Sequence, residues 1–375
     1  TLYNGMAGGA WSSSDITIAT VGAGTGVVTG IMAGNAVITY AMATGCNATI
    51  NATVDPLPAA ITGTPEVCVG LTTTLSSATP GGTWTSANPF IATVTAGGGV
   101  VTGIISGTTM ITYTLPTGCM TTVIVTVDPL PAPITGTMAI CVGQTSALNN
   151  ITLGGTWSSS DASIASISAA GLVLGVSPGI AIITYTLPTG CISTASFTVN
   201  PLPSAIGGSL LVCAGFMSNL TNSLPGGIWS ITAPATVATI HPLTGVVTGI
   251  SPGTGTVTYT LGSGCNVTAV VTVSPLPPAI TGPAFVCEGS VTTLGDAITG
   301  GTWTTSNPLI ATVDSVAGIV SGIAPGNATV TYTIGTGCIN IRTMTVNPLP
   351  ALITGTPVVC EQFSTTLGDA TPLGA

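Results

Sequence analysis

GGTWTSANPFIATV, residues 81–94, is the stretch that decides the fold, because its pattern returns at a nearly constant interval along the whole chain. Its tryptophan has four counterparts, and successive tryptophans are 73, 73, 72 and 74 residues apart: Trp11, Trp84, Trp157, Trp229 and Trp303. The segments that follow, GVVTGI (99–104) and MITYTLPTGC (110–119), recur with it. A period this regular indicates one folding unit copied head to tail. We expect the five tryptophans to lie in the cores of these units.

The period reads as β-structure throughout. Helical periodicity is absent, and β-branched residues dominate. In the second copy the pattern predicts seven short strands, which are Ala60–Cys68, Thr72–Ser77, Gly82–Ser86, Ile91–Val94, Val100–Ile104, Thr108–Leu115 and Met120–Val127. Alternation in the sixth strand places Met110 on one face and Ile111 and Tyr113 on the other. Seven strands with a tryptophan on the third describe an immunoglobulin-like β-sandwich.

The predicted fold is therefore all-β, a tandem array of sandwiches of about 73 residues. We divide the chain into repeat 1 (1–57, lacking its opening strands), four whole repeats and a C-terminal segment that supplies only opening strands. The whole ones are repeat 2 (58–130), repeat 3 (131–202), repeat 4 (203–276) and repeat 5 (277–349), and the C-terminal segment is 350–375.

The motifs resemble a known family. W-[ST]-S-[AS]-x-x-x-[IV]-A-[TS]-[VI], then G-x-V-x-G, then G-[NT]-x-x-[IV]-T-Y, is similar to the bacterial immunoglobulin-like domain of group 2 type. The motifs stand at Trp84–Val94, Gly99–Gly103 and Gly107–Tyr113, and again, with Thr305 in place of the serine, at Trp303–Val313, Gly318–Gly322 and Gly326–Tyr332. The resemblance covers essentially the whole chain. It implies stalks and adhesive arrays of long secreted bacterial proteins, occasionally glycan- or receptor-binding modules, and no catalytic residues.

Composition excludes several functions. The chain has one basic residue, ten acidic residues and a net charge of −9. It therefore lacks the cations that neutralise phosphates in nucleic-acid binding, or that form a polybasic membrane-surface site. Apolar runs end after about six residues, whereas a membrane-spanning helix needs about 20, so we expect no membrane insertion.

The ten cysteines form a second regular pattern. Each period carries one cysteine in VC-x-G (Cys68, Cys141, Cys213, Cys287) and one in TGC or SGC (Cys119, Cys191, Cys265, Cys338), and Cys46 and Cys360 continue the two series. Fixed positions in small β units indicate disulfides and an oxidising, extracellular compartment. C-x-x-C pairs and histidine clusters, which would indicate metal, are absent from the sequence.

Two pairings are compatible with this pattern. Pairing within a repeat gives Cys68–Cys119, Cys141–Cys191, Cys213–Cys265 and Cys287–Cys338, and it is the simpler choice. If the strands alternate up and down, however, the two cysteines of a repeat lie at opposite ends, beyond the roughly 7 Å Cα separation that a disulfide tolerates. Neighbouring repeats would then be joined instead, for example Cys68 to Cys191. We predict the within-repeat pairing and keep the other open.

The repeats are connected by Pro-Leu-Pro, at Pro56–Pro58, Pro129–Pro131, Pro201–Pro203, Pro275–Pro277 and Pro348–Pro350. Such short proline-rich linkers favour extended geometry and little hinging, which predicts a stiff array.

The two ends of the chain match each other, since Thr1–Ala10 repeats the pattern of Thr366–Ala375. We expect either a window of a longer array, which we favour, or subunits that join end to end by strand complementation. In the second case the partner is another copy of the chain, and Cys360 would bond Cys46 of its neighbour.

No catalytic, cofactor-binding or metal site can be assembled from the sequence. His241 and Arg342 occur once each and are expected at the surface, and Asp55 and Asp128 are expected to cap turns. Glu66, Glu288 and Glu361 recur near the VC-x-G cysteine but not in every repeat. Asn-x-Ser/Thr sequons mark candidate glycosylation sites at Asn47, Asn51, Asn150, Asn219, Asn266 and Asn327.

The sequence thus predicts a non-enzymatic structural protein, secreted or on the cell surface, in an extracellular filament or stalk, as in biofilm-forming bacteria. The alternative is an adhesin that binds glycan or a cell-surface partner through its inter-strand loops. A third class, an accessory array attached to an enzyme, would need catalytic modules outside this sequence.

Overall fold

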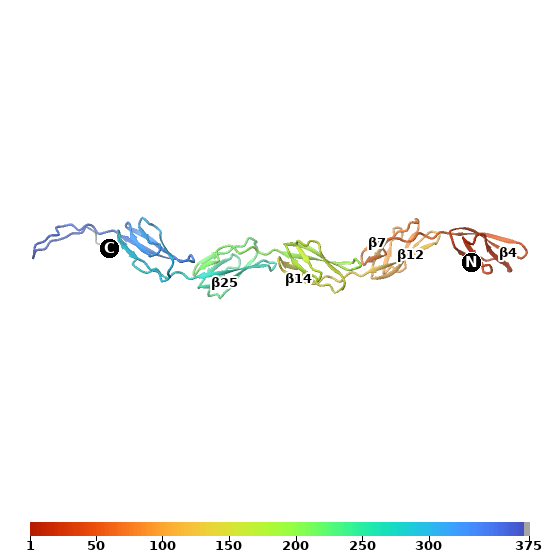
Figure 1. Ribbon diagram of the computed structural model, residues 1–375, viewed down its shortest axis with the longest axis horizontal. Helices are drawn as coiled ribbons and strands as arrows, with labels where there is room; N and C mark the ends of the chain where they lie inside the picture. The colour runs from red at the N-terminus through yellow and green to blue at the C-terminus, as the bar shows by residue number, and fades with distance from the viewer. Residues whose placement is uncertain (371–375) are drawn as a thin grey trace. The chain divides into compact units, whose positions relative to one another are not determined.

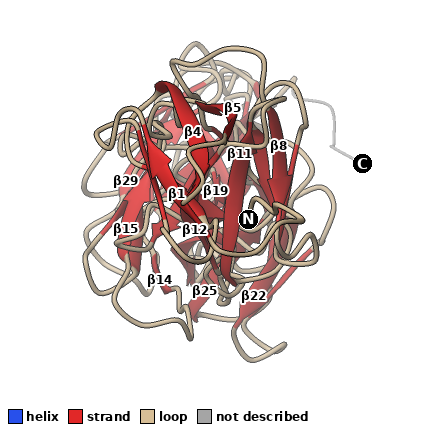
Figure 2. Ribbon diagram, turned by 90° about the vertical axis from the view of Figure 1, so that its right-hand side faces the viewer, coloured by secondary structure: helices blue, strands red, loops and turns tan. Residues whose placement is uncertain are grey.

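The computed structural model describes residues 1–370, and every regular element in this part of the chain is a β-strand (Figure 2). The all-β prediction is confirmed. The chain divides into two compact parts, Thr1–Val199 and Asn200–Ala375, which are described separately.

Repeat 2 shows the complete unit, and two of its strands are labelled in Figure 1. Its strands are β6 (Glu66–Cys68), β7 (Thr72–Thr74), β8 (Thr83–Ser86), β9 (Ala92–Val94), β10 (Val100–Gly103), β11 (Gly107–Thr114) and β12 (Met120–Asp128). One sheet has the order β6-β12-β11-β8 and the other the order β7-β10-β9. All pairs in this repeat are antiparallel except β6 and β12, which run parallel.

The rest of the first part repeats this plan. Repeat 3 comprises β13 (Ala139–Cys141), β14 (Thr145–Ala147), β15 (Thr156–Ser159), β16 (Ala165–Ile167), β17 (Leu172–Gly175), β18 (Gly179–Thr186) and β19 (Ile192–Asn200). Repeat 1 has the later strands, β1 (Gly9–Ser13), β2 (Ala19–Val21), β3 (Val28–Gly30), β4 (Gly34–Met42) and β5 (Asn47–Val54), paired as β1-β4-β5 and β2-β3.

The second part contains two whole sandwiches. Repeat 4 comprises β20 (Leu211–Cys213), β21 (Met217–Asn219), β22 (Ile228–Thr232), β23 (Ala238–Ile240), β24 (Val246–Gly249), β25 (Gly253–Thr260) and β26 (Asn266–Ser274). Repeat 5 comprises β27 (Phe285–Cys287), β28 (Val291–Thr293), β29 (Thr302–Thr305), β30 (Ala311–Val313), β31 (Ile319–Gly322), β32 (Gly326–Thr333) and β33 (Ile339–Asn347). Residues 350–370 contain one isolated bridge, Thr354 to Gly368, and 371–375 lie outside the described residues.

The core of each sandwich is built by alternation along its strands. Ile111 and Tyr113 are buried while Met110 faces outward, as predicted. Trp84 lies directly opposite Tyr113, with ring centroids 4.6 Å apart. Trp229 and Trp303 are buried in the same way, whereas Trp11 and Trp157 are partly exposed, so the expectation of five buried tryptophans is met in three repeats.

The opening segment differs from the prediction of one strand, Ala60–Cys68. Thr62 bridges Ser76, and only Glu66–Cys68 then joins the four-stranded sheet. The break falls at Gly63, where φ is +113° and a Cβ would meet the carbonyl oxygen of Thr74 at 2.4 Å. A glycine with positive φ turns the chain between the two contacts, which a continuous strand would not allow.

Candidate functional site

The parallel pairing of β6 with β12 decides where the two cysteines of a repeat lie. Cys68 ends β6 and is in register with Asp128, the last residue of β12. Cys119 directly precedes Met120, the first residue of β12. The two cysteines therefore lie at opposite ends of a nine-residue strand, which spans about 30 Å at 3.3 Å per residue.

A disulfide accordingly joins successive repeats in the first part of the chain. Cys68 of repeat 2 is bonded to Cys191 of repeat 3, with Cα atoms 5.6 Å apart and 123 residues between them in sequence. The Sγ atom of Cys191 lies 4.0 Å from the carbonyl oxygen of Asp128, the residue beside Cys68 in the sheet. The bond thus closes over the end of β12, where the chain leaves repeat 2.

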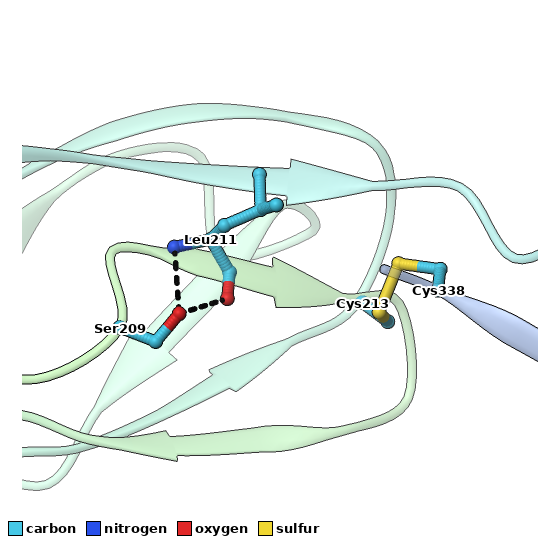
Figure 3. Close-up of a disulfide and its surroundings, with 4 residues drawn as sticks. All are labelled: Ser209, Leu211, Cys213 and Cys338. Atoms are coloured by element: carbon cyan, nitrogen blue, oxygen red, sulfur yellow. Dashed lines mark hydrogen bonds between the residues drawn. A yellow bond between two sulfur atoms is a disulfide. The ribbon is translucent and has the colours of Figure 1, made fainter. Parts of the chain in front are cut away.

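The second part contains an equivalent bond. Cys213 at the end of β20 is bonded to Cys338, which directly precedes β33 in repeat 5, with Cα atoms 5.7 Å apart (Figure 3). Ser209 supports the opening strand, because its hydroxyl donates to the carbonyl of Leu211 and accepts from the Leu211 N–H (Figure 3). Cys141 and Cys265 are also disulfide-bonded.

These bonds show that the predicted within-repeat pairing is wrong. Because Cys68 and Cys191 are bonded to each other, neither Cys68–Cys119 nor Cys141–Cys191 forms. Because Cys213 and Cys338 are bonded to each other, neither Cys213–Cys265 nor Cys287–Cys338 forms. The physical reason is the separation along the last strand, and the open alternative, Cys68 to Cys191, is the pairing observed.

A tight turn presents the second cysteine of each bond. In repeat 3 the N–H of Leu187 donates to the carbonyl of Cys191, and the N–H of Gly190 donates to the carbonyl of Leu187. Gly190 has φ of +84°, a conformation that favours glycine and accounts for the TGC motif. Cys191 and Cys338 are fully buried at 0% exposure, so solvent reductants have little access to these sulfurs.

Four cysteines are free in the structure. Cys46, Cys287 and Cys360 are exposed, and Cys119 is partly buried. The Sγ atom of Cys119 lies 3.7 Å from the carbonyl oxygen of Asp55, which repeats the position of Cys191 beside Asp128. Cys119 therefore occupies the position of a bridging cysteine without its bond.

A tyrosine fixes the loop before each tryptophan strand, a role that is not predicted in the sequence analysis. The hydroxyl of Tyr113 donates to the carbonyl of Thr79 at 2.7 Å and accepts from the N–H of Gly82 at 2.9 Å. The same pair of bonds is made by Tyr40, Tyr185, Tyr259 and Tyr332. The signal was the recurrence of tyrosine at one place in every repeat.

The isolated polar residues have local structural roles. His241 is exposed, and its Nδ1 accepts from the N–H groups of Leu243 and Thr244, as expected for a turn residue. Arg342, expected to face solvent, is half-buried and donates to the carbonyl of Ile280. Residues 1–370 contain no group of three or more His, Cys, Asp or Glu that could hold a metal ion.

Three exposed carboxylates cap turns. The Oδ1 of Asp161 accepts from the hydroxyl and the N–H of Ser163, and these hydrogen bonds lower the pKa of Asp161 below its usual value. Asp15 is held in the same way by Thr17, which lowers its pKa, and the N–H groups of Ala317 and Val316 lower the pKa of Asp314. In repeats 2 and 5 the position of Asp161 is occupied by Asn88 and Asn307. Their side-chain oxygens accept the equivalent hydrogen bonds from backbone N–H groups.

The candidate glycosylation sites differ in accessibility. Asn150 is buried, and its amide nitrogen donates to the carbonyl of Ala132, so the folded repeat does not offer it to a glycan. The other five asparagines are exposed: Asn47, Asn51, Asn219, Asn266 and Asn327.

A shallow hollow of similar lining lies beside both disulfides described above. In repeats 2 and 3 it is lined by Thr64, Glu66, Cys68, Leu71 and Thr189. In repeats 4 and 5 it is lined by Ser209, Leu211, Cys213, Phe216 and Gly337. Both hollows contain hydroxyl and backbone groups but no set of side chains suited to catalysis.

Comparison with curated proteins gives a relative of this chain. It is ice-binding protein 1 of Shewanella frigidimarina (strain NCIMB 400), 29% identical over 387 residues. The match covers 87% of this chain and 42% of the relative, so the chain spans less than half of that protein. In the described residues no helix is long and apolar enough to cross a lipid bilayer.

Several solved structures show a distant likeness to this chain. Invasin, a bacterial integrin-binding protein, has 14% identity and a TM-score of 0.29, covering 84% of this chain and 76% of its own. The human desmocollin-1 ectodomain has 10% identity and a TM-score of 0.18, covering 91% of this chain and 92% of its own. Domains 1–6 of the surface layer protein SbsC have 16% identity and a TM-score of 0.20, covering 84% and 59%.

The family comparison agrees with the motifs and with the sandwich. The bacterial Ig-like domain (group 2) matches residues 137–194 and 290–338. These segments lie within repeats 3 and 5, whose strand order is shared by repeats 2 and 4. The chain is therefore a tandem array of immunoglobulin-like sandwiches, two of which match the bacterial Ig-like domain (group 2).

Proposed function

We propose that the chain is a load-bearing component of an extracellular filament or cell-surface stalk. The observation that carries this proposal is that the disulfides join one repeat to the next, as Cys68–Cys191 and Cys213–Cys338 do. A disulfide within a repeat would only brace that repeat. A disulfide between repeats provides a covalent route along the array that survives the unfolding of the sandwiches.

The route can be followed from bond to bond. Tension that enters at the N-terminus reaches Cys68, crosses to Cys191, follows the chain to Cys213 and crosses to Cys338. The residues between the bonded cysteines, with sequence separations of 123 and 125, are bypassed. About a third of the chain can therefore extend while the bonds are closed, and reduction would release roughly 800–900 Å more at 3.3–3.6 Å per residue.

The chemistry of the bonds supports an extracellular setting. Disulfides persist in oxidising compartments, and buried sulfurs resist the attack of thiolates that reduces exposed bonds. Cys191 and Cys338 are both fully buried. The free energy needed to expose these two sulfurs adds to the resistance of the disulfides to reduction.

Single-molecule pulling from the two termini tests the proposal. We expect the oxidised chain to reach a limiting length near one third of the length of the reduced chain. Cys287→Ser is the matched control, because Cys287 is free and its loss leaves the two bridges intact. An oxidised chain that extends as far as the reduced chain would show that the disulfides do not carry tension.

The name of the relative suggests ice binding as a second activity, which can be measured on the same purified chain. The relative is named ice-binding protein 1, and the match covers 42% of it. We expect purified chain to show no thermal hysteresis, as for a stalk. Measurable hysteresis would instead support ice binding by the array itself, and retention on a glycan array would favour the adhesin alternative.

A further inference from the structure

We propose that the hollow beside each inter-repeat disulfide admits a small thiol, and that this thiol attacks only the VC-x-G cysteine, Cys68 in one bond and Cys213 in the other. The ligand class is a thiolate of tripeptide size, such as glutathione. The site itself is independent of the proposed load-bearing function, and only its consequence for extension rests on that function.

The two cysteines of each bond differ in accessibility. Cys191 and Cys338 are 0% exposed, so in the folded chain they present no surface to a reagent. Their partners, Cys68 and Cys213, are only partly buried. Thiol–disulfide exchange begins when a thiolate meets one of the two sulfurs directly, so here it begins at the VC-x-G cysteines.

The partly buried cysteine also lines the hollow. Cys68 borders a space of about 340 Å³, whose walls come from its own repeat, at Thr64 and Thr72, and from the turn of the next repeat, at Thr189. Cys191 is not part of this lining. A reagent that enters the hollow therefore approaches the disulfide from the side of Cys68.

Repeats 4 and 5 form the same hollow from the same positions. Cys213, drawn in Figure 3 with its bond to Cys338, borders a space of about 370 Å³. Met217, the counterpart of Thr72, and Gly337 of the next turn also line it, whereas Cys338 does not. Because different side chains make the two hollows, the fold of the bonded junction creates the site.

Backbone hydrogen bonds fix the turn that borders the hollow. The N–H of Leu71 donates to the carbonyl of Cys68 at 3.0 Å, and the N–H of Gly70 donates to the carbonyl of Gly103 in the other sheet. The equivalent two bonds are made in repeat 4. The hollow is therefore a fixed feature of the folded junction, and its shape does not depend on a particular side chain.

The size of the hollows selects the reagent. Volumes of 340 and 370 Å³ lie at the lower end of the roughly 300–1,000 Å³ that is typical of small-molecule sites. A tripeptide thiol fits this space, whereas a folded oxidoreductase domain does not enter it. We therefore assign the hollow to a small thiol.

The exchange consists of two substitutions at sulfur. The entering thiolate attacks Sγ of Cys68 and forms a mixed disulfide, and the electron pair of the broken bond leaves on Sγ of Cys191. Cys191 takes up a proton from solvent, and its S–H donates to the carbonyl of Asp128, 4.0 Å away. A second thiolate then attacks the small-molecule sulfur and releases the Cys68 thiolate. One protein disulfide is reduced, and two small thiols are oxidised to their disulfide.

The two hollows differ in charge, which gives the site a selectivity that can be measured. Glu66 lines the first hollow, and Leu211 takes its place in the second. A carboxylate repels an anionic thiolate, and such an exposed charge changes a rate by about two- to fivefold at low ionic strength and less in salt. We therefore expect Glu66 to slow the attack of glutathione on Cys68.

The site makes the length of the proposed stalk dependent on small thiols. Attack at Cys68 opens a bond that bypasses a sequence separation of 123 residues, and attack at Cys213 opens one that bypasses 125. Reduction through the hollows would release these residues under load without prior unfolding of a sandwich.

The test is adduct mapping on the oxidised 375-residue chain. The unbonded thiols are first blocked with N-ethylmaleimide, glutathione is added under native conditions, and the reaction is quenched with acid during its early phase. Pepsin digestion and mass spectrometry then locate the bound glutathione. We expect it on peptides that contain Cys68 and Cys213 and not on those that contain Cys191 and Cys338. Equal labelling of both cysteines of a bond, as exchange from an unfolded chain gives, would overturn the proposal.

A bulky substitution tests whether the hollow is the entrance. Thr72→Trp places a large side chain in the lining, so we expect slower labelling of Cys68 and unchanged labelling of Cys213 in the same chain. Thr74→Trp is the matched control, because Thr74 is exposed on the same strand but does not line the hollow. The variants are compared at a temperature at which circular dichroism shows both folded. Equal rates in the two variants would exclude the hollow as the route.

A charge substitution tests the selectivity. We expect Glu66→Gln to accelerate the labelling of Cys68 by glutathione about two- to fivefold at low salt, and not to accelerate labelling by cysteamine, which is a cation. Glu288→Gln removes the same charge at a place that lines neither hollow and should change neither rate. Acceleration of both thiols, or acceleration by the control, would contradict a charge-selective site. Mapping is done without load, so the proposal can fail while the pulling result stands.

Discussion

Tyr113 shows how single residues hold each sandwich together. Its ring packs on Trp84, and its hydroxyl bonds to both sides of the loop that leads into the tryptophan strand. The neighbouring Gly82 is required sterically, because a Cβ there would lie 2.6 Å from the tyrosine ring. The Gly, Trp and Tyr that recur together in the sequence are therefore one packing unit.

Removal of this hydroxyl tests the unit. Tyr113→Phe leaves the Gly82 N–H and the Thr79 carbonyl without their partner in a part-buried place. We expect repeat 2 to lose about 1–3 kcal/mol of unfolding free energy, measured by denaturant titration. Tyr3→Phe is the control, since Tyr3 is 89% exposed. Equal stability of both variants and the unmodified chain would contradict this role.

Asp161, also a single residue, makes a pH-dependent contribution to the stability of repeat 3. Its hydrogen bonds to Ser163 lower its pKa in the folded protein. The stability that it contributes is therefore present above the unfolded pKa, about 3.9, and is lost as the pH falls through the folded value. We expect Asp161→Asn to reduce the acid sensitivity of repeat 3, measured as the change in melting temperature between pH 7 and pH 2.5.

The reciprocal exchange is its control. Asn88 accepts the equivalent backbone bond in repeat 2 without a titrating group. Asn88→Asp should introduce acid sensitivity there. If neither exchange alters the pH dependence, the carboxylate hydrogen bonds do not contribute to it.

At the scale of strands, the end of β6 is held closely by its neighbours. Gly103 of β10 lies against it, and a Cβ would meet the carbonyl oxygen of Cys68 at 2.9 Å and Val127 Cγ1 at 2.8 Å. Its carbonyl also accepts from the N–H of Gly70. The end of β6, which carries the bridging cysteine, is therefore held by a glycine of the other sheet.

Gly103→Ala is expected to displace this strand end. Overpacking against backbone costs typically 1–3 kcal/mol, so we expect a lower melting temperature and slower formation of Cys68–Cys191 during oxidative refolding. Gly97→Ala in the same repeat is the control, since its Cβ would meet no atom within 4 Å. A Gly103→Ala chain that behaves like the control would show that β6 tolerates a shift.

Strand positions were largely predictable because alternation and glycine-rich turns are local signals. The sixth and seventh strands were expected at Thr108–Leu115 and Met120–Val127, and they form Gly107–Thr114 and Met120–Asp128. The predicted opening strand is too long, because the chain turns at Gly63, where φ is +113° and the nearby carbonyl oxygen of Thr74 leaves no room for a Cβ. Strand propensities along the sequence do not indicate which backbone groups lie close together in the folded repeat.

For the whole molecule, the disulfide pairing could not be deduced from spacing. Cys68 and Cys119 are the nearer pair in sequence, but a parallel contact between the first and last strands carries Cys68 to the far end of β12. An up-and-down strand arrangement implies this separation, and the separation excludes a disulfide within a repeat. The proposed function is least visible in the sequence, because it depends on which repeats are bonded to each other rather than on any reactive side chain.

Disulfide mapping of the oxidised chain tests the central claim, that successive repeats are covalently linked, most directly. Free thiols are alkylated first, the chain is digested with pepsin at low pH, and linked peptides are identified by mass spectrometry before and after reduction. We predict peptides joining Cys68 to Cys191 and Cys213 to Cys338. Peptides joining Cys68 to Cys119 and Cys213 to Cys265 would contradict it.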